Sequence, residues 1–278
     1  MGRSRKNKPL IREVEITDVA AEGKALCRVD ERVVFVNGAV PGDIVDIQVT
    51  KKRSSYYEGN AVAFHKYSEM RATPFCKHFG VCGGCKWQNI PYEKQLEYKA
   101  REVLNNLQRI GKVELPEQLP ILPSAKNKYY RNKLEFTFSN KRWLSPEEMN
   151  SGEEISEKQG LGFHIPGLFD KVVDITECHL QMEPSDDIRM WIRAYAKENG
   201  LEFFDLKEQK GFLRTLIIRT ASTGDVMVVL SFFHEDKERR KALLEGLHNA
   251  FPQITSLMYC INPKGNDTIG DLDISVYY

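Results

Sequence analysis

The chain has 278 residues, of which 41% are hydrophobic and 28% are charged, and its formal net charge at pH 7 is +1. This length favours two domains, and the composition suits a well-solvated protein with enough apolar residues for a core. No run of about 18 apolar residues is present and no apolar segment follows the N-terminus, which together exclude a membrane span and a secretory signal and predict a cytoplasmic protein.

Basic residues are segregated along the chain, although the net charge is close to zero. Two basic segments stand out: residues 1–12 contain no acidic residue, and Glu135 is the only acidic residue in 124–142. A shorter basic cluster is formed by Lys51, Lys52 and Arg53. Segregation of this kind produces a local positive field that can attract a polyanion. Ordinary solvated surfaces are the alternative interpretation of each cluster.

Residues 1–11 are predicted to form a basic N-terminal arm, and residues 12–68 a compact all-β domain. Apolar and polar residues alternate over residues 44–49, and Asn37-Gly38 is a strong turn signal. Short strands with such turns in about 55 residues predict an OB-like barrel, a fold that commonly binds single-stranded nucleic acid. The expected RNA contacts are the basic cluster and the neighbouring aromatic pair, unless the aromatic rings pack inward: Lys51, Lys52, Arg53, Tyr56 and Tyr57.

Residues 69–90 are rich in cysteine and glycine and are predicted to form an irregular loop. Pro91 suits the first turn of a helix, and Gly111 is a natural end for it. Between them, apolar residues recur at steps of three and four: Leu96, Ala100, Val103, Leu104, Leu107 and Ile110. Residues 91–119 are therefore assigned to a linker helix whose apolar stripe must bury against a partner.

Residues 120–278 are predicted to form a mixed, mostly antiparallel α/β domain. Strands are expected at residues 134–138, 172–175, 213–219, 226–233 and 256–261, and helices at residues 184–199 and 236–250. The acidic segment 145–159 is expected on the surface. The fold class that follows is α+β, with an OB-like barrel, a cysteine-rich loop and a central domain in that order.

Three of the six cysteines lie within ten residues: Cys76, Cys82 and Cys85. Cytosolic proteins rarely use such groups as disulfides, so the spacing points to metal or redox chemistry. Cys178 is the candidate for a fourth ligand, because it follows an apolar strand and could present its thiol at the end of that strand.

The cysteines alone leave three interpretations open. A [4Fe–4S] cluster suits three clustered cysteines and one distant cysteine, and structural zinc more often uses two paired knuckles. Reactive or merely buried thiols are the third interpretation. Cys27 and Cys260 stand alone in apolar strands, so we expect them to pack in the core.

A family resemblance emerges from the combined motifs. The pattern Cys76-x₅-Cys82-Gly-Gly-Cys85-x-Trp87-Gln88 precedes a Tyr130-Arg131-Asn132-Lys133 segment and the later Cys178. Together they resemble the RNA 5-methyluridine methyltransferases, in the iron–sulfur branch that acts on 23S ribosomal RNA. Residues 12–66 resemble the TRAM domain of that family, an OB-like RNA-binding barrel.

This resemblance implies a [4Fe–4S] cluster on Cys76, Cys82, Cys85 and Cys178. It also implies that the protein grips a folded RNA while the target uridine is turned out of its stack. Arg131, Asn132 and Lys133 match a family motif close to the RNA and the active-site entrance. The alternative for these three residues is a polar strand edge that supports the sheet.

Family members continue into a domain that binds S-adenosylmethionine and supplies the cysteine nucleophile. The present sequence has no glycine-rich strand–loop–helix for that cofactor. We therefore expect the RNA-binding, iron–sulfur part of a longer monomeric methyltransferase, inactive alone. Two other classes are alternatives: a free-standing RNA-binding module with an iron–sulfur or zinc site, and a radical enzyme, whose C-x₃-C-x₂-C spacing is absent here.

Overall fold

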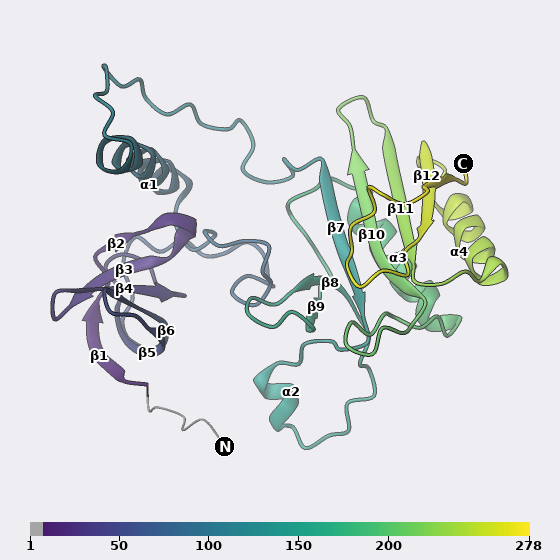
Figure 1. The fold of residues 1–278 in the computed structure, drawn as a ribbon, viewed down its shortest axis with the longest axis horizontal. Coiled ribbons are helices and arrows are strands. Elements are labelled where there is room, and N and C mark those ends of the chain that lie inside the picture. The colour runs from purple at the N-terminus through teal and green to yellow at the C-terminus, as the bar shows by residue number, and fades with distance from the viewer. Residues whose placement is uncertain (1–7) are drawn as a thin grey trace. The chain divides into compact units, whose positions relative to one another are not determined.

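The computed structural model describes residues 8–278, so the basic residues expected in an arm within residues 1–7 lie outside the described part. The chain divides into two compact units. The N-terminal unit comprises residues 1–80 and 85–125, and the C-terminal unit comprises residues 81–84 and 126–278. Figure 1 follows the chain through both units in order of residue number.

The N-terminal unit contains a six-stranded sheet with the order β1-β5-β6-β4-β3-β2. All neighbouring strands are antiparallel except β4 and β6, which are parallel. A single 3₁₀ turn, Ala21–Gly23, separates β2 from β3. The strands are β1 (Leu10–Glu15), β2 (Asp18–Val19), β3 (Ala25–Val29), β4 (Arg32–Asn37), β5 (Ile44–Lys52) and β6 (Tyr56–Lys66).

Alternating side chains of these strands build the core of the N-terminal unit. Its fully or nearly fully buried members include Ile16, Cys27, Val34, Val36, Val45 and Ile47. Burial raises the pKa of the Cys27 thiol to about 11. Cys27 therefore behaves as a small core hydrophobe, as its sequence context predicts.

The first strand begins inside the segment predicted to be a basic arm. Leu10 pairs with Gln48 and Ile11 with Ile47, and the Pro9 carbonyl accepts a hydrogen bond from the Val49 N–H at 3.1 Å. Strand β1 therefore begins two residues before the start expected for the all-β domain, because the backbone groups at the edge of β5 pair with the chain before residue 12.

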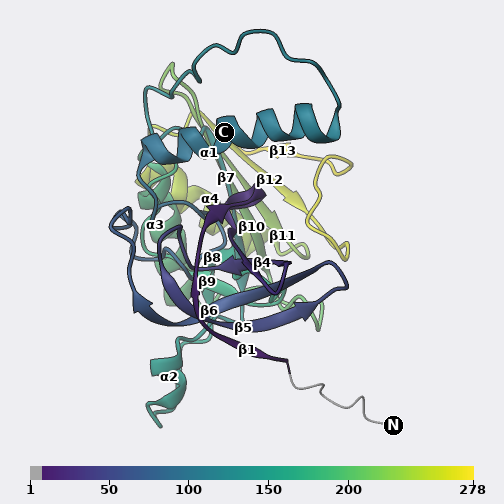
Figure 2. The same cartoon turned by 90° about the vertical axis from the view of Figure 1, so that its left-hand side faces the viewer.

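The helix after the cysteine-rich loop is α1 (Tyr92–Asn105), continued by a π-helical turn over Asn106–Ile110. None of its residues is buried, and Val103 and Ile110 are 57% and 79% exposed. Residues 111–125 follow without helix or strand. The helix runs along one end of the N-terminal sheet in Figure 2.

The C-terminal unit is built on a seven-stranded sheet with the order β13-β12-β11-β10-β7-β8-β9. Only β11 and β12 are parallel, so the expectation of a mostly antiparallel sheet is confirmed. The strands are β7 (Lys133–Ser139), β8 (Gly160–His164), β9 (Val172–Asp174), β10 (Leu213–Thr220), β11 (Val226–Phe232), β12 (Ser256–Ile261) and β13 (Ser275–Val276).

Two long helices, α3 (Ser185–Glu198) and α4 (Lys237–Ala250), pack on one face of this sheet (Figure 1). They meet at Trp191 and Gly246, where a Cβ on the glycine would lie 3.0 Å from the indole ring. Ile188 and Ile192 of α3 are completely buried. The apolar stripe that predicts each helix is the stripe that covers the sheet.

Strand β8 and helix α2 of the C-terminal unit lie where the sequence predicts neither a strand nor a helix. Strand β8 contains Gly162, where a Cβ would lie 2.1 Å from the Val173 carbonyl oxygen, so only glycine permits this pairing. Helix α2 (Pro146–Asn150) lies in the acidic surface segment, and Ser145 and Glu148 form a capping box there.

A buried arginine organises the loop after β12. The Arg214 guanidinium is 0% exposed and donates to the carbonyl oxygens of Asn262, Lys264 and Asn266 at 2.5–2.8 Å. It also pairs with Asp267 at 3.0 Å. Because a buried cation must be fully hydrogen-bonded, this loop has little freedom to move away.

Over residues 8–278, no helix combines the length and apolar composition that a bilayer crossing requires.

Candidate nucleic-acid interface and cysteine site

The predicted basic cluster lies at the end of the β5–β6 hairpin. Lys51, Lys52 and Arg53 are all exposed. Lys51 Nζ pairs with Glu58 Oε1 at 2.8 Å, and Lys52 Nζ lies 5.3 Å from the centre of the Tyr57 ring. The side chains therefore remain on the surface, where a polyanion can reach them, but two of them already have a partner within the unit.

Tyr57 does not present its ring to solvent. It is 8% exposed, its hydroxyl accepts a hydrogen bond from Arg32 Nη1 at 2.5 Å, and the Arg32 guanidinium lies 5.4 Å from the ring centre. Tyr56 packs edge-on against Phe35 at 5.6 Å. The expectation that this aromatic pair is available for stacking is wrong for Tyr57, because β6 turns its ring into the core.

Arg32 extends the hairpin cluster in space, since it is exposed and shares Tyr57 with Lys52. The sequence carries no signal for it, because Arg32 comes from β4, and only the parallel β4–β6 pairing brings it beside Tyr57. The Lys51 hydrogen bond, assisted by the charge of Lys24, lowers the pKa of Glu58. The cluster is thus built around an acid that stays ionised near neutral pH.

Arg131, Asn132 and Lys133 lie at the start of β7 in the C-terminal unit, and all three are exposed. Their backbone is fixed on both sides. The Arg131 N–H donates to the Leu180 carbonyl at 2.8 Å, and the Asn132 carbonyl accepts from the Thr220 N–H at 3.0 Å. The motif therefore supports the sheet through its backbone and keeps its side chains available on the surface.

Two neighbours enlarge this second basic surface. Arg219 is exposed and stands opposite Lys133 in the β7–β10 pairing, and Tyr130 is 54% exposed. Tyr129 is held differently, because its hydroxyl contacts His179 Nδ1 at 2.8 Å. Arg219 could not be selected from the sequence, because its proximity to Lys133 depends on a strand register.

The cysteine-rich loop has no helix or strand between β6 and α1 and is held by individual hydrogen bonds. Gln88 Oε1 accepts the Cys76 N–H at 3.1 Å, which fixes one thiol-bearing residue. Trp87 packs so closely on Gly23 that a Cβ there would lie 1.8 Å from the indole nitrogen. Gln88 and Trp87 thus shape the loop.

Cys82 is followed by two glycines with a definite structural role. A Cβ on Gly83 would lie 2.7 Å from the His164 carbonyl oxygen, and the Gly84 N–H donates to Cys82 Sγ at 3.4 Å. A backbone N–H directed at a sulfur stabilises a thiolate, and such hydrogen bonds are typical of cysteines that ligate iron–sulfur clusters.

Cys178 lies in the turn between β9 and α3 and is 8% exposed. Its N–H donates to Asp186 Oδ2 at 2.7 Å, and the other oxygen of Asp186 accepts from Arg189 Nη2 at 2.8 Å. Arg189 is completely buried and also donates to the Ile175 carbonyl. The position of Cys178 is therefore fixed by a charged network rather than by a flexible loop.

The four cysteines are divided between the units. Cys76 and Cys85 belong to the N-terminal unit, and Cys82 and Cys178 to the C-terminal unit. Within residues 8–278, no three His, Cys, Asp or Glu side chains are grouped so that they could hold a metal ion. Cys27 and Cys260 are 0% and 1% exposed and lie in the cores of their sheets, as expected.

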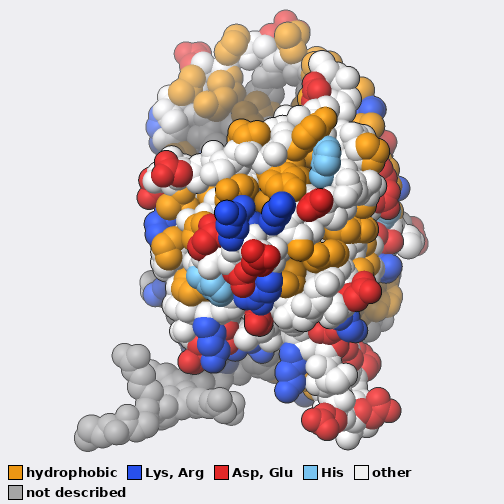
Figure 3. Space-filling view, turned by 90° about the vertical axis from the view of Figure 1, so that its right-hand side faces the viewer, with side chains coloured by type: hydrophobic (Ala, Val, Ile, Leu, Met, Phe, Trp, Pro, Cys, Tyr) orange, Lys and Arg blue, Asp and Glu red, His pale blue; other side chains and the backbone are white. Residues whose placement is uncertain are grey.

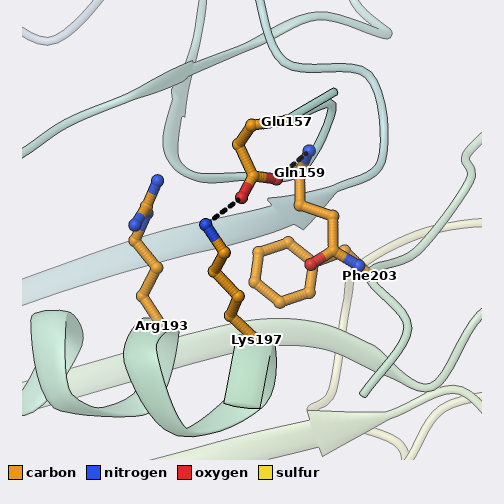
Figure 4. A pocket seen from close by; sticks show the side chains of 5 residues that line it. All are labelled: Glu157, Gln159, Arg193, Lys197 and Phe203. Carbon is orange, nitrogen blue, oxygen red and sulfur yellow. Dashed lines mark hydrogen bonds and ion pairs between the residues drawn. The ribbon is translucent and has the colours of Figure 1, made fainter. Parts of the chain in front are cut away.

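A crevice of the C-terminal unit differs from these basic surfaces in its charge. The crevice in Figure 4 is lined by Glu157, Gln159, Arg193, Lys197 and Phe203, and its charges neutralise each other. Lys197 Nζ pairs with Glu157 Oε2 at 3.1 Å, and Arg193 binds Asp174. The face drawn in Figure 3 mixes acidic, basic and apolar side chains, so it lacks the single-sign patch of a nucleic-acid surface.

Comparison with known proteins gives a domain and a set of relatives. Residues 11–62 match the TRAM domain. An uncharacterized RNA methyltransferase of Porphyromonas gingivalis is 55% identical over 95% of this chain and 58% of its own length. A second, from Bacteroides thetaiotaomicron, is 53% identical over 93% of this chain and 58% of its own. The chain thus spans little more than half the length of these curated relatives.

A solved structure shares the fold. The crystal structure of Pyrococcus abyssi tRNA (uracil-54, C5)-methyltransferase in complex with S-adenosyl-L-homocysteine superposes with a TM-score of 0.63 at 21% identity, over 94% of this chain and 54% of that chain. The chain therefore carries a TRAM domain and is homologous, along nearly its whole length, to one part of proteins described as RNA methyltransferases.

Proposed function

We propose that this chain is the RNA-binding part of an S-adenosylmethionine-dependent uracil-C5 methyltransferase that modifies a uridine of 23S ribosomal RNA. The observation that carries the proposal is the similarity to RNA methyltransferases over 95% of the chain. The shared fold with a tRNA (uracil-54, C5)-methyltransferase supports C5 of uracil as the position methylated. The cysteine motif of the 23S branch supports a ribosomal substrate.

In this proposal, the residues described here bind and orient the RNA. Exposed cations at the β5–β6 hairpin and at the start of β7 contact phosphates, because neither surface is buried within its own unit. S-adenosylmethionine and the nucleophilic cysteine belong to the part of the longer protein outside this chain. Covalent addition to C6 of uracil makes C5 nucleophilic enough to accept the methyl group.

The function is tested in cells of the source organism that lack the gene. Ribosomal RNA and transfer RNA from these cells are separated and digested, and the 5-methyluridine of each is measured by mass spectrometry. We expect one uridine of 23S RNA to lose its methyl group and to regain it when the full-length gene is restored. If 5-methyluridine is lost from transfer RNA alone, the substrate is transfer RNA and not ribosomal RNA. If no RNA loses 5-methyluridine, the proposed methylation is refuted.

The RNA-binding surface is tested with this chain and a fluorescently labelled single-stranded RNA. Replacing Lys51, Lys52 and Arg53 by Ala removes up to three cations that neutralise phosphates, so the slope of log K against log salt falls by about 0.7 for each phosphate no longer neutralised. The matched control replaces two exposed α4 lysines, Lys237 and Lys241, by Ala. If the slope of log K against log salt is unchanged in the hairpin variant, this cluster does not contact the phosphates of the RNA.

We also propose that Cys76, Cys82, Cys85 and Cys178 hold a [4Fe–4S] cluster. The donor set fits, since four thiols are the normal ligands of such a cluster and the Gly84 N–H already points at Cys82 Sγ. The proposal rests on this chemistry and on the motif, because the thiols are not grouped around a metal position in the described residues. When bound, the cluster supplies a cross-link between segments far apart in sequence.

The cluster is tested on protein purified without oxygen. We expect a brown sample with about four irons and four sulfides per chain, and we expect Cys82→Ser to lose the iron and to lower the melting temperature. Cys260→Ser is the matched control, because that thiol is buried in a strand of the C-terminal sheet. One zinc per chain would refute the cluster, as would full iron content in Cys82→Ser.

Helix α1 has a place in the same proposal. No residue of its apolar stripe is buried, and Val103, Leu107 and Ile110 in the stripe and its continuation are exposed; the relatives also extend well beyond the region that this chain matches. We propose that α1 packs on the catalytic part of the longer protein. The exposed stripe would then be buried on assembly, and its hydrophobic surface would hold the two parts together.

A further inference from the structure

Two aromatic rings stack on each other where β6 ends in the N-terminal unit, one from the strand and one from the residue that follows it. The rings of Phe64 and Tyr67 are stacked at 4.9 Å with an angle of 15° between their planes. Phe64 packs against the core of the sheet, whereas Tyr67 is 62% exposed. The stack therefore joins a fixed ring beneath to a ring that faces solvent.

Arg71 fixes the stack from the side. Its guanidinium lies 5.0 Å from the centre of the Phe64 ring and 5.2 Å from that of Tyr67. Two of its nitrogens bind Asp43, Nε at 2.8 Å and Nη2 at 2.6 Å, and Asp43 is completely buried. Because a buried carboxylate needs these donors, Arg71 is held rigidly beside both rings.

The backbone around Tyr67 is held by the same carboxylate. The Ser68 N–H donates to Asp43 Oδ1 at 2.9 Å, and a Cβ on Gly42 would lie 2.7 Å from Ser68 Oγ. The turn before β5 and the segment after β6 thus pack tightly together. A side chain ordered in this way loses little conformational entropy when a ligand stacks on it.

The ring of Tyr67 differs from that of Tyr57, one of the two aromatic residues that the sequence places beside the basic cluster. Tyr57 is 8% exposed and is covered by Arg32 and Lys52. Tyr67 keeps most of its surface open, and the exposed cation Lys66 precedes it in the chain. An exposed aromatic ring beside positive charge is the arrangement that binds an unpaired base and its phosphate.

We propose that Tyr67, stacked on Phe64 and braced by Arg71, is the platform on which an unpaired RNA base stacks. This inference rests on the proposed RNA-binding function and assigns it a position. Recognition through a π-face is independent of base identity, so the platform selects single-stranded over double-stranded RNA rather than a sequence. Tyr67 is then a binding residue, and Asp43 is a positioning residue that acts through Arg71.

The test measures fluorescence anisotropy of the intact chain with a labelled 12-nucleotide single-stranded RNA of mixed sequence, and with the same strand in a duplex. Tyr67→Ala should weaken binding of the single strand about 10-fold, the effect expected for one stacked base. Tyr67→Phe keeps the ring and should bind within about twofold of the wild type. The slope of affinity against salt should not change in either variant, because every cation that meets a phosphate is retained.

Val62→Ala is the matched control, since Val62 is a 55% exposed apolar residue of β6, the strand that ends just before Tyr67. It should leave RNA affinity unchanged. If wild-type protein binds RNA and Tyr67→Ala binds equally well, the platform is refuted while the RNA-binding function stands. An equal loss in Tyr67→Phe and Tyr67→Ala would also refute stacking. If wild-type protein binds neither RNA, the proposed function falls, and the platform falls with it.

Discussion

Helices α1 and α3 each contain 14 residues and an apolar stripe, but they are used differently. In α3, Ile188 and Ile192 are completely buried against the sheet of the C-terminal unit. In α1, no residue is buried, and Val103 is more than half exposed. The same periodicity therefore gives a buried helix–sheet interface for α3 and an apolar stripe without a buried residue for α1.

The difference shows what an amphipathic pattern specifies. Spacing at three and four residues fixes the helix and the direction of its stripe, but it carries no information about the partner. For α3 the partner is a sheet within the same unit. For α1 we propose a partner outside this chain, and substitutions at three positions test that contrast.

The largest effect is expected from Ile192→Ala in α3. The side chain is completely buried, so truncation leaves a cavity and should lower the free energy of unfolding by about 2–5 kcal/mol. Urea denaturation followed by circular dichroism measures this change. A loss below about 1 kcal/mol would show that the α3 interface relaxes around the cavity, and the contrast with α1 would weaken.

A smaller effect is expected at a helix start. Asp236 caps α4, where its side chain accepts the Arg239 N–H at 3.1 Å, whereas α1 begins at Pro91 without a side-chain cap. Asp236→Asn keeps a capping oxygen, and Asp236→Ala removes it. We expect Asp236→Ala to lower the melting temperature by about 3 °C and Asp236→Asn to lower it less.

The Asp236 cap also predicts a dependence on pH. The hydrogen bond from the Arg239 N–H, and then the Arg239 side chain, lower the pKa of Asp236. A lowered folded-state pKa means that its contribution is present above the unfolded pKa, about 3.9, and is lost as the pH falls through the folded value. The difference in melting temperature between wild type and Asp236→Ala should therefore shrink below about pH 4. A constant difference would show that the charge does not contribute.

The smallest effect is expected from Val103→Ala in α1. Because Val103 is 57% exposed, the free energy of unfolding of this chain should change by less than about 0.5 kcal/mol. In the full-length protein, the same substitution should lower the melting temperature measurably if α1 packs on the catalytic part. Equal results in the two proteins would contradict that packing.

The sequence predicts the regular elements of the C-terminal unit well. Strand β12 has the bounds expected from its apolar run; α3 is one residue shorter than expected at each end, and α4 begins one residue later than expected. Strand β8 is missed, because Gly160 and Gly162 give it a low strand propensity and its pairing depends on close backbone contact. Whether such a segment forms a strand depends on its pairing with β7 and β9 and not on its local sequence.

The sites are predicted less completely than the fold. Lys51, Lys52 and Arg53 are exposed as expected. Arg32 becomes part of the hairpin surface, and Arg219 part of the surface at β7, only because strand pairing places them there. Tyr57 is a further case, because its position in the hairpin is predictable whereas the direction of its ring is set by the register of β6. Side-chain chemistry is thus readable from the sequence, and side-chain neighbours are not.

The burial of Cys27 has a practical consequence for handling the protein. With a pKa of about 11, only about one Cys27 thiol in ten thousand is ionised at pH 7. Cys260 is shielded in the same manner, since burial raises its pKa as well. Maleimide or iodoacetamide applied to the folded protein will therefore report on the three cysteines that are not buried, Cys76, Cys82 and Cys85, and mass spectrometry can follow their protection when iron and sulfide are added.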